Sequence, residues 1–168
     1  MANLADFSEG LDTSLEEALS RQHVAHRFTL SFIGAVPRHV AVLHDFKLSS
    51  LVSLESGRYF TIFAGRDANG DGNPNSDRVG LLGRNTLQGP AYATVDIRIS
   101  RDFGLGGRTR GEVSVDIFNL FDRVNVKDLN TNYGGFDPSV PPNPLLAYGT
   151  PRDAFNPRQV QLGVKLRF

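Results

Sequence analysis

The sequence predicts an all-β fold, an antiparallel up-and-down meander of about five strands. Three observations predict it. Apolar and polar residues alternate in five separate runs, as they do along a strand whose two faces meet different surroundings. Short and long connections follow one another between these runs. Finally, 17 Gly and 9 Pro in 168 residues favour many short elements over long helices.

The first two strands are predicted over 28–36 and 46–55. In both runs, phenylalanine, leucine or valine alternates with serine, threonine or a charged residue. Ahead of them, Ser14 followed three residues later by Glu17 resembles a helix-capping box. This pair predicts a short helix over 15–20.

The other three strands are predicted over 92–103, 112–121 and 159–168. In the first of these, Arg101 interrupts the apolar row near its end. The second has Phe118 and Leu120 at its far end, which is therefore apolar on both faces. The last alternates most regularly and ends on Phe168.

The connections decide what kind of sheet the strands form. Alternation alone fits a soluble antiparallel sheet with one wet face. However, the links through 37–39 and 104–108 are short, whereas 56–89 and 125–156 are long. Loops of that length are uncommon inside compact domains, but transmembrane barrels pair short periplasmic turns with long extracellular loops. The pattern therefore favours part of a transmembrane β-barrel with long outer loops.

This topology orients the chain. The final strand runs toward the periplasmic rim, so the two long links lie outside and the chain forms one partial domain, 1–168. Residues 1–22 are expected to belong to an outer loop, and 23–168 to the C-terminal barrel strands and loops. Aromatic residues fall at the predicted strand ends, as the interfacial girdles of such barrels require. They are Tyr59, Phe60, Phe63, Phe103, Phe118, Phe121 and Phe168. Ordinary core packing would place aromatic residues there as well.

Composition argues against several classes of function. Eighteen basic and 18 acidic residues balance, without the basic cluster expected of a nucleic-acid binder. The chain contains no Cys, which excludes disulfides and thiolate chemistry. The spacing of His23 and His26 would point them to opposite strand faces, against a zinc site. No nucleophile elbow or phosphate loop is present, so we expect no enzyme.

One acidic loop predicts a calcium site. Between 67 and 77, oxygen-bearing side chains recur at every second position with Gly after the third, as a loop needs to wrap a hard cation. The candidate ligands are Asp67, Asn69, Asp71, Asn73 and Asp77. Position twelve of the calcium-loop pattern is Arg78 instead of Glu. The alternative is a solvated turn, because tight turns select the same residue types.

Several motifs together carry a family resemblance from about His26 to Phe168. They are Ser-Gly-Arg-Tyr-Phe-Thr at 56–61, Asp-Ala-Asn-Gly-Asp-Gly-Asn at 67–73, Asp-Arg at 77–78, Gly-Pro-x-Tyr at 89–92 before Asp96-x-Arg98, Phe-Asn-Leu-Phe-Asp-Arg-Val-Asn at 118–125, and Asn-Pro-Arg-Gln at 156–159. With these motifs the chain resembles the TonB-dependent outer-membrane receptors, especially the Oar-like group with a carboxypeptidase-regulatory-like N-terminal domain.

The resemblance implies a barrel of about 22 strands that a plug domain fills and that imports a scarce substrate with force from TonB. It also implies that Phe168 is the signal read by the barrel-assembly machinery. The implied partners are outer-membrane lipid, the rest of the barrel, the plug and the TonB system, in a cell outer membrane of Gram-negative type. We expect this chain to supply one wall segment that does not transport alone, because five strands leave two open edges. The alternative is a soluble calcium-dependent β-sandwich binding module.

Overall fold

A computed structural model describes residues 16–37, 39–40, 43–68, 70–73, 76–80, 82–134 and 145–168. They divide into two compact units. The sheet unit contains His26–Glu55, Tyr92–Asn125 and Phe155–Phe168. The loop unit contains the described residues of Met1–Ala25, Ser56–Ala91 and Val126–Ala154. No helix in the described part of the chain is long and apolar enough to cross a membrane.

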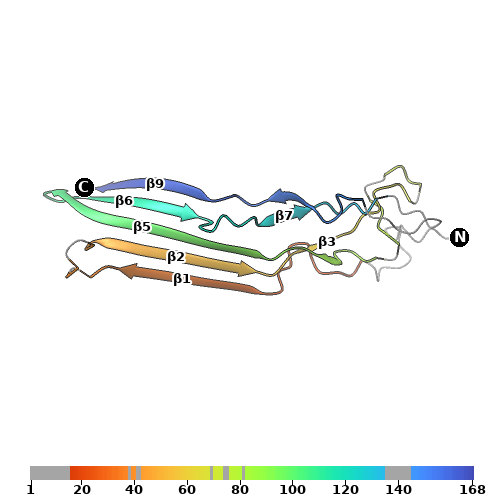
Figure 1. Cartoon of the computed structure of the whole chain (residues 1–168), viewed down its shortest axis with the longest axis horizontal. Coiled ribbons are helices and arrows are strands. Elements are labelled where there is room, and N and C mark those ends of the chain that lie inside the picture. Colours follow the sequence, from red (N-terminus) through yellow and green to blue (C-terminus); the bar gives the residue numbers. More distant parts are fainter. Residues whose placement is uncertain are drawn as a thin grey trace. The chain divides into compact units, whose positions relative to one another are not determined.

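The sheet unit is the predicted antiparallel meander. Its five strands are β1 (Arg27–Ala35), β2 (Phe46–Glu55), β5 (Tyr92–Gly106), β6 (Thr109–Phe118) and β9 (Gln159–Arg167), which lie side by side in that order (Figure 1). All neighbours are antiparallel. The prediction of an all-β meander of five strands is therefore confirmed.

The register places the alternating residues of all five strands in common rows. For example, Leu54 pairs with Phe28 on one side and Ala93 on the other, and Val115 pairs with Ile99 and Leu162. Because side chains alternate across a strand, these pairings form one apolar face. It consists of Phe28, Leu30, Phe32, Leu48, Val52, Leu54, Ala93, Val95, Ile97, Ile99, Phe103, Val113, Val115, Ile117, Val160, Leu162, Val164 and Leu166.

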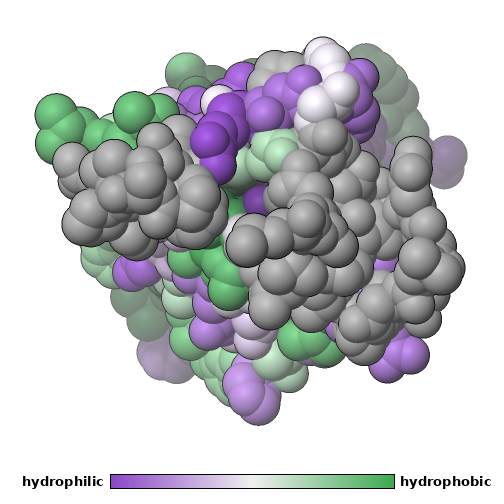
Figure 2. Space-filling model, turned by 90° about the vertical axis from the view of Figure 1, so that its right-hand side faces the viewer, coloured by the Kyte–Doolittle hydropathy of each residue, from purple (hydrophilic) through white to green (hydrophobic). Residues whose placement is uncertain are grey.

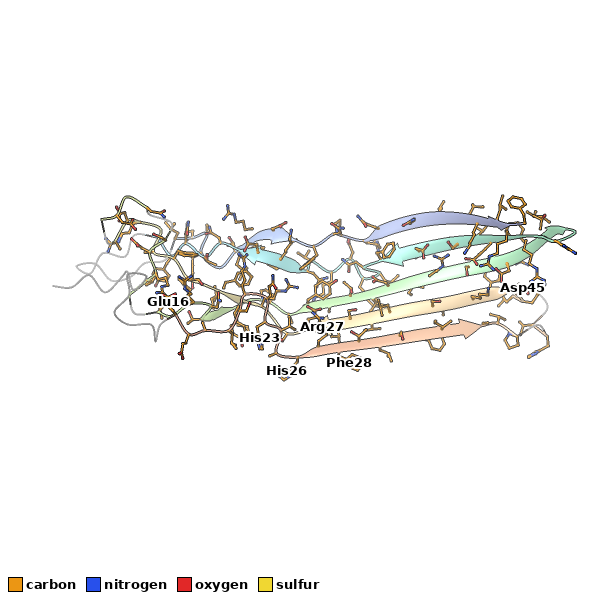
Figure 3. The ribbon with its side chains drawn as sticks, turned by 180° about the vertical axis from the view of Figure 1, so that it is seen from behind. Glu16, His23, His26, Arg27, Phe28 and Asp45 are labelled. Atoms are coloured by element: carbon orange, nitrogen blue, oxygen red, sulfur yellow. The ribbon has the colours of Figure 1, made fainter. Side chains whose placement is uncertain are left out.

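Most side chains of the apolar face remain exposed. Phe28 is 54% exposed, and Leu162 on β9 is 76% exposed. In Figure 3, side chains stand off the strands on both sides, and the labelled Arg27 and Phe28 lie at the start of β1. A sheet in water normally covers such a face with another layer. The sheet unit therefore has an apolar surface of the kind that contacts lipid.

Two places in the sheet favour glycine, the turn between β5 and β6 and position 111 on β6. The turn between β5 and β6 has φ values of 100° at Gly106 and 58° at Gly107, which glycine adopts at low cost. On the apolar face, a Cβ at Gly111 would approach the Phe103 ring to 2.5 Å. Glycine there makes room for the aromatic side chain of the opposite strand.

Three sequence predictions need correction. The described residues Glu16–Ser20 form a turn and irregular chain, so the predicted helix is wrong there, while Ser14 lies outside the described residues. The link between β1 and β2 spans 36–45, so the predicted segment 37–39 is only part of it, and the chain turns again before Asp45, whose φ is 68°. Strand β6 ends at Phe118 instead of residue 121, because Asn119 has a φ of 51°.

The loop unit has strands and a core of its own, which the sequence pattern did not predict. Strand β3 (Tyr59–Phe60) pairs with β4 (Leu87–Gln88), and β7 (Val126–Leu129) pairs with β8 (Pro151–Ala154). Phe60, Ala64 and Leu129 are buried. Phe60 therefore belongs to a core and not to the exposed aromatic girdle that the sequence suggested. In Figure 2, hydrophilic and hydrophobic residues are intermixed on the side shown.

Candidate functional site: the polar face of the sheet

The face opposite the apolar one carries most of the charged residues of the sheet, while Arg101 lies in the apolar row against Phe46. The polar face includes Lys47 on β2, Arg98 and Asp102 on β5, Glu112 and Asp116 on β6, and Lys165 and Arg167 on β9. Asp102 lies opposite Glu112, and Arg98 lies opposite Asp116. The alternation of the strands thus gathers charges from four segments on one surface.

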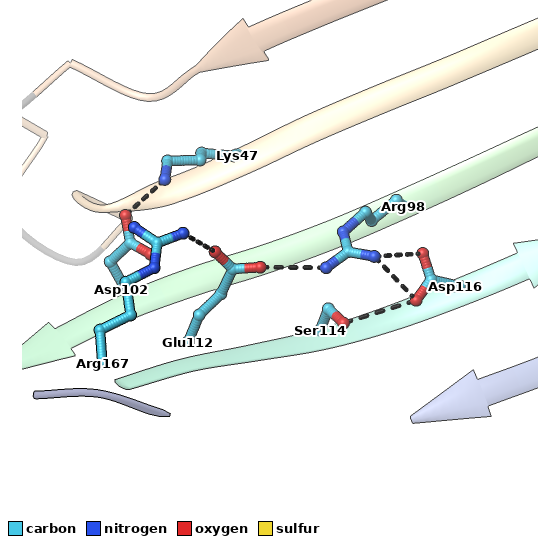
Figure 4. A network of polar contacts seen from close by, with 7 residues as sticks. All are labelled: Lys47, Arg98, Asp102, Glu112, Ser114, Asp116 and Arg167. Carbon is cyan, nitrogen blue, oxygen red and sulfur yellow. Dashed lines mark hydrogen bonds and ion pairs between the residues drawn. The ribbon is translucent and has the colours of Figure 1, made fainter. Parts of the chain in front are cut away.

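These charges, apart from Lys165, form a paired network (Figure 4). Arg98 joins two carboxylates of β6: its Nη2 lies 3.0 Å from Oε1 of Glu112, and its Nη1 lies 3.2 Å from Oδ1 of Asp116. Lys47 pairs with Asp102, and Nη2 of Arg167 lies 3.9 Å from Oε2 of Glu112. Three cations therefore balance three carboxylates in this network.

The network suits a water-facing wall. The two β6 carboxylates are largely covered by their partners, whereas Arg98 and Arg167 remain about half exposed. Ion pairs whose cation lies at the surface contribute little to stability, so the network mainly keeps the surface hydrophilic. Ion pairs between strands join Arg98 to Glu112 and Asp116, and Arg167 to Glu112.

Asp96 has a different role from its charged neighbours. Its Oδ1 accepts a hydrogen bond of 2.9 Å from the backbone N–H of Asn119. The side chain of Asn119 then exchanges hydrogen bonds with the backbone of Arg123, at 2.9 Å and 3.1 Å. Asp96 therefore anchors the turn that ends β6.

A second asparagine of this turn is buried, and sequence reasoning missed its role. Asn125 is 1% exposed. Its Oδ1 accepts from the N–H of Ala93 and its Nδ2 donates to the C=O of Ala93, both at 2.9 Å. The side chain thus imitates a neighbouring strand at the start of β5. Asn125 is the last residue of the motif at 118–125. This motif could have indicated a structural role for Asn125, but it was used only to identify the family resemblance.

The four candidate calcium ligands that the structure describes, Asp67, Asp71, Asn73 and Asp77, lie in the loop unit. Oδ1 of Asp67 accepts N–H groups from Gly70 at 2.7 Å and Asp71 at 3.1 Å, and its Oδ2 accepts from Gly72 at 2.8 Å. Asp71 accepts from the N–H of Asn73 at 2.7 Å. This is how aspartate stabilises turns, the alternative that the sequence left open.

The remaining acidic ligand is buried. Asp77 is 1% exposed and accepts a hydrogen bond from the backbone of Ala68. Asn69 lies outside the described residues. Among the residues that are described, no group of three or more His, Asp and Glu side chains has a metal-binding arrangement. Calcium binding therefore stays a prediction.

The C-terminal residue follows the end of β9. Phe168 is exposed, and its neighbour Arg167 points into the polar network. The Phe168 side chain is 94% exposed, so packing against the described residues does not explain a phenylalanine at this position. Its role as an assembly signal stays a prediction from the resemblance.

Comparison with known protein families identifies the family of the chain. The family described as outer membrane beta barrel domain matches residues 72–161, more than half of the chain. The matched region contains β5, β6 and the start of β9. No curated protein and no solved structure matches the chain. With its exposed apolar face and its charged polar face, the chain belongs to the outer membrane beta barrel domain family and is a protein of the outer membrane.

Proposed function

We propose that the chain is the C-terminal wall segment of a TonB-dependent outer-membrane transporter that imports a scarce substrate. The observation that carries the proposal is the separation of the five-stranded sheet into an exposed apolar face and a charge-paired polar face. The apolar face contacts lipid, and the polar face lines a water-filled lumen, as in transmembrane barrels. The motifs quoted above support the narrower assignment to TonB-dependent receptors.

The proposal includes the way in which the segment is completed. Among the described strands, β1 pairs only with β2 and β9 pairs only with β6. Open strand edges are costly in lipid because their backbone groups lack hydrogen-bond partners. The rest of the barrel therefore supplies the missing neighbours, and this segment alone does not transport.

Gel mobility after refolding tests the proposal. The 168-residue chain, refolded in detergent micelles, should run at the same position with and without boiling, because five strands do not close a barrel. A monomer whose mobility shifts on boiling would show a closed small barrel and contradict the wall-segment assignment. A chain that is monomeric and folded without detergent would favour the soluble β-sandwich module instead.

A further inference from the structure

The loop unit contains a cavity that the wall-segment function does not use. Its volume is about 390 Å³, within the range of about 300–1,000 Å³ that is typical of small-molecule sites. Its walls come from five segments that are distant in sequence, represented by Arg21, Phe60, Asn85, Asp128 and Arg152. Seven of the ten lining residues are polar or charged.

Specific contacts hold the walls of the cavity together. Nη2 of Arg21 lies 2.6 Å from Oδ1 of Asp128, and its guanidinium stacks 5.3 Å above the Phe60 ring. Asn85 accepts the Thr61 hydroxyl at 3.0 Å and donates to the Leu19 carbonyl at 2.7 Å. These contacts therefore hold four parts of the chain around the cavity: the N-terminal segment, β3, the residues before β4, and β7.

One cation in the cavity wall, Arg152, lacks a counter-charge among the residues that the structure describes. The Arg152 side chain makes no hydrogen bond or ion pair with any residue in the described ranges. On the same strand, its neighbour Asp153 pairs instead with Lys127 at 2.8 Å. Since Asp128 balances Arg21, the lining residues keep one net positive charge, which Arg152 carries. A guanidinium in this setting binds a carboxylate through two parallel hydrogen bonds.

Neutral hydrogen-bonding groups lie in the same wall. The side chains of Thr131 and Asn132 line the cavity and make no hydrogen bond within the described parts of the chain. Their hydroxyl and amide groups can each both donate and accept. Such groups match the hydroxyls of a sugar better than the aliphatic surface of a lipid.

We propose that this cavity binds a monosaccharide-sized acidic sugar, with its carboxylate on Arg152 and its hydroxyls on Thr131 and Asn132. The inference deepens the proposed function, because it names a class of substrate that the loops would contact. The inference rests on the proposed function only in treating the bound sugar as a transport substrate. The binding itself is a property of the loop unit.

Calorimetric titration of the full chain in detergent micelles with D-glucuronate tests the site. Binding is expected, with D-glucose at least about tenfold weaker, because it lacks the carboxylate that a charge-assisted pair requires. Arg152→Gln should weaken glucuronate binding by about tenfold or more. The matched control is Arg108→Gln in the exposed β5–β6 turn, which should leave binding unchanged.

Other outcomes overturn the proposal. Equal binding of glucose and glucuronate would remove the role of Arg152, and equal binding of inorganic phosphate would show a simple anion site without sugar recognition. Equal losses in both arginine variants would indicate nonspecific charge attraction. Because the titration involves neither transport nor barrel closure, its failure would leave the wall-segment proposal to the gel-mobility test.

Discussion

The five-stranded sheet keeps its apolar side chains exposed, whereas the loop unit buries Phe60, Ala64 and Leu129 in a core of its own. Apart from Arg101, the paired rows of the sheet follow a two-residue period, and its two faces differ in polarity. The loop unit instead mixes short strand pairs with buried charged residues such as Asp77 and Arg78. The difference indicates that the sheet depends on its surroundings for stability, while the loop unit depends on its internal contacts.

The largest expected effect follows from removing the Phe60 side chain. Phe60 is 5% exposed, and its ring packs where a Cβ of Gly89 would otherwise lie. Phe60→Ala should destabilise the loop unit by about 3–5 kcal/mol, as truncation of a buried aromatic does. Hydrogen exchange should show faster exchange of the Gly89 and Phe63 amides, with β5 and β6 unchanged. Phe121→Ala is the control, because Phe121 is 74% exposed. Equal effects of the two variants would contradict a separate core.

A smaller effect is expected from a charge on the apolar face of the sheet. Leu162→Arg in the middle of β9 should destabilise the sheet in lipid by about 2–4 kcal/mol, because the guanidinium would lie in the hydrocarbon layer. Gln161→Arg, its neighbour on the polar face, is the matched control and should change stability much less. Urea unfolding in lipid vesicles measures both variants. A larger loss for Gln161→Arg would reverse the assignment of the two faces.

The smallest effect concerns the pH dependence of the loop unit. The hydrogen bond from Arg84 lowers the pKa of Glu16, and the charge of Arg78 lowers it further. The ionised carboxylate therefore favours the folded state above its ordinary pKa of 4.5, and this contribution disappears as the pH falls through the lowered value. We expect less than about 1 kcal/mol, because one partner is half exposed. Glu16→Gln should be less stable than the parent chain at pH 7 and equally stable at low pH. A difference that does not depend on pH would contradict this account.

Sequence reasoning predicted the sheet well for a physical reason. Each strand of the sheet has one face in an apolar environment and one in a polar environment. The alternation of apolar and polar residues in 92–103 and 159–168 therefore shows which face each residue is on. The structure also has the predicted alternation of short and long links between the strands of the sheet, although the first short link includes more residues than 37–39. Periodicity therefore predicts strands whose surroundings differ sharply between faces.

The loop unit and its cavity could not be predicted in the same way. Strands β3 and β4 have two residues each, too few to show any period. Arg21, Asn85 and Arg152 line one cavity although they are distant in the sequence. The aspartate-rich stretch from Asp67 illustrates the same limit, since one set of residues serves both tight turns and cation sites.

Cysteine labelling of β9 tests the central claim, that the sheet has one lipid face and one water face. The chain contains no Cys, so each single-cysteine variant gives an unambiguous signal. In outer-membrane vesicles, a water-soluble thiol reagent should label Gln161→Cys and Lys165→Cys. It should leave Val160→Cys, Leu162→Cys and Val164→Cys unmodified. Equal labelling of both sets, or labelling of only the second set, would contradict the account.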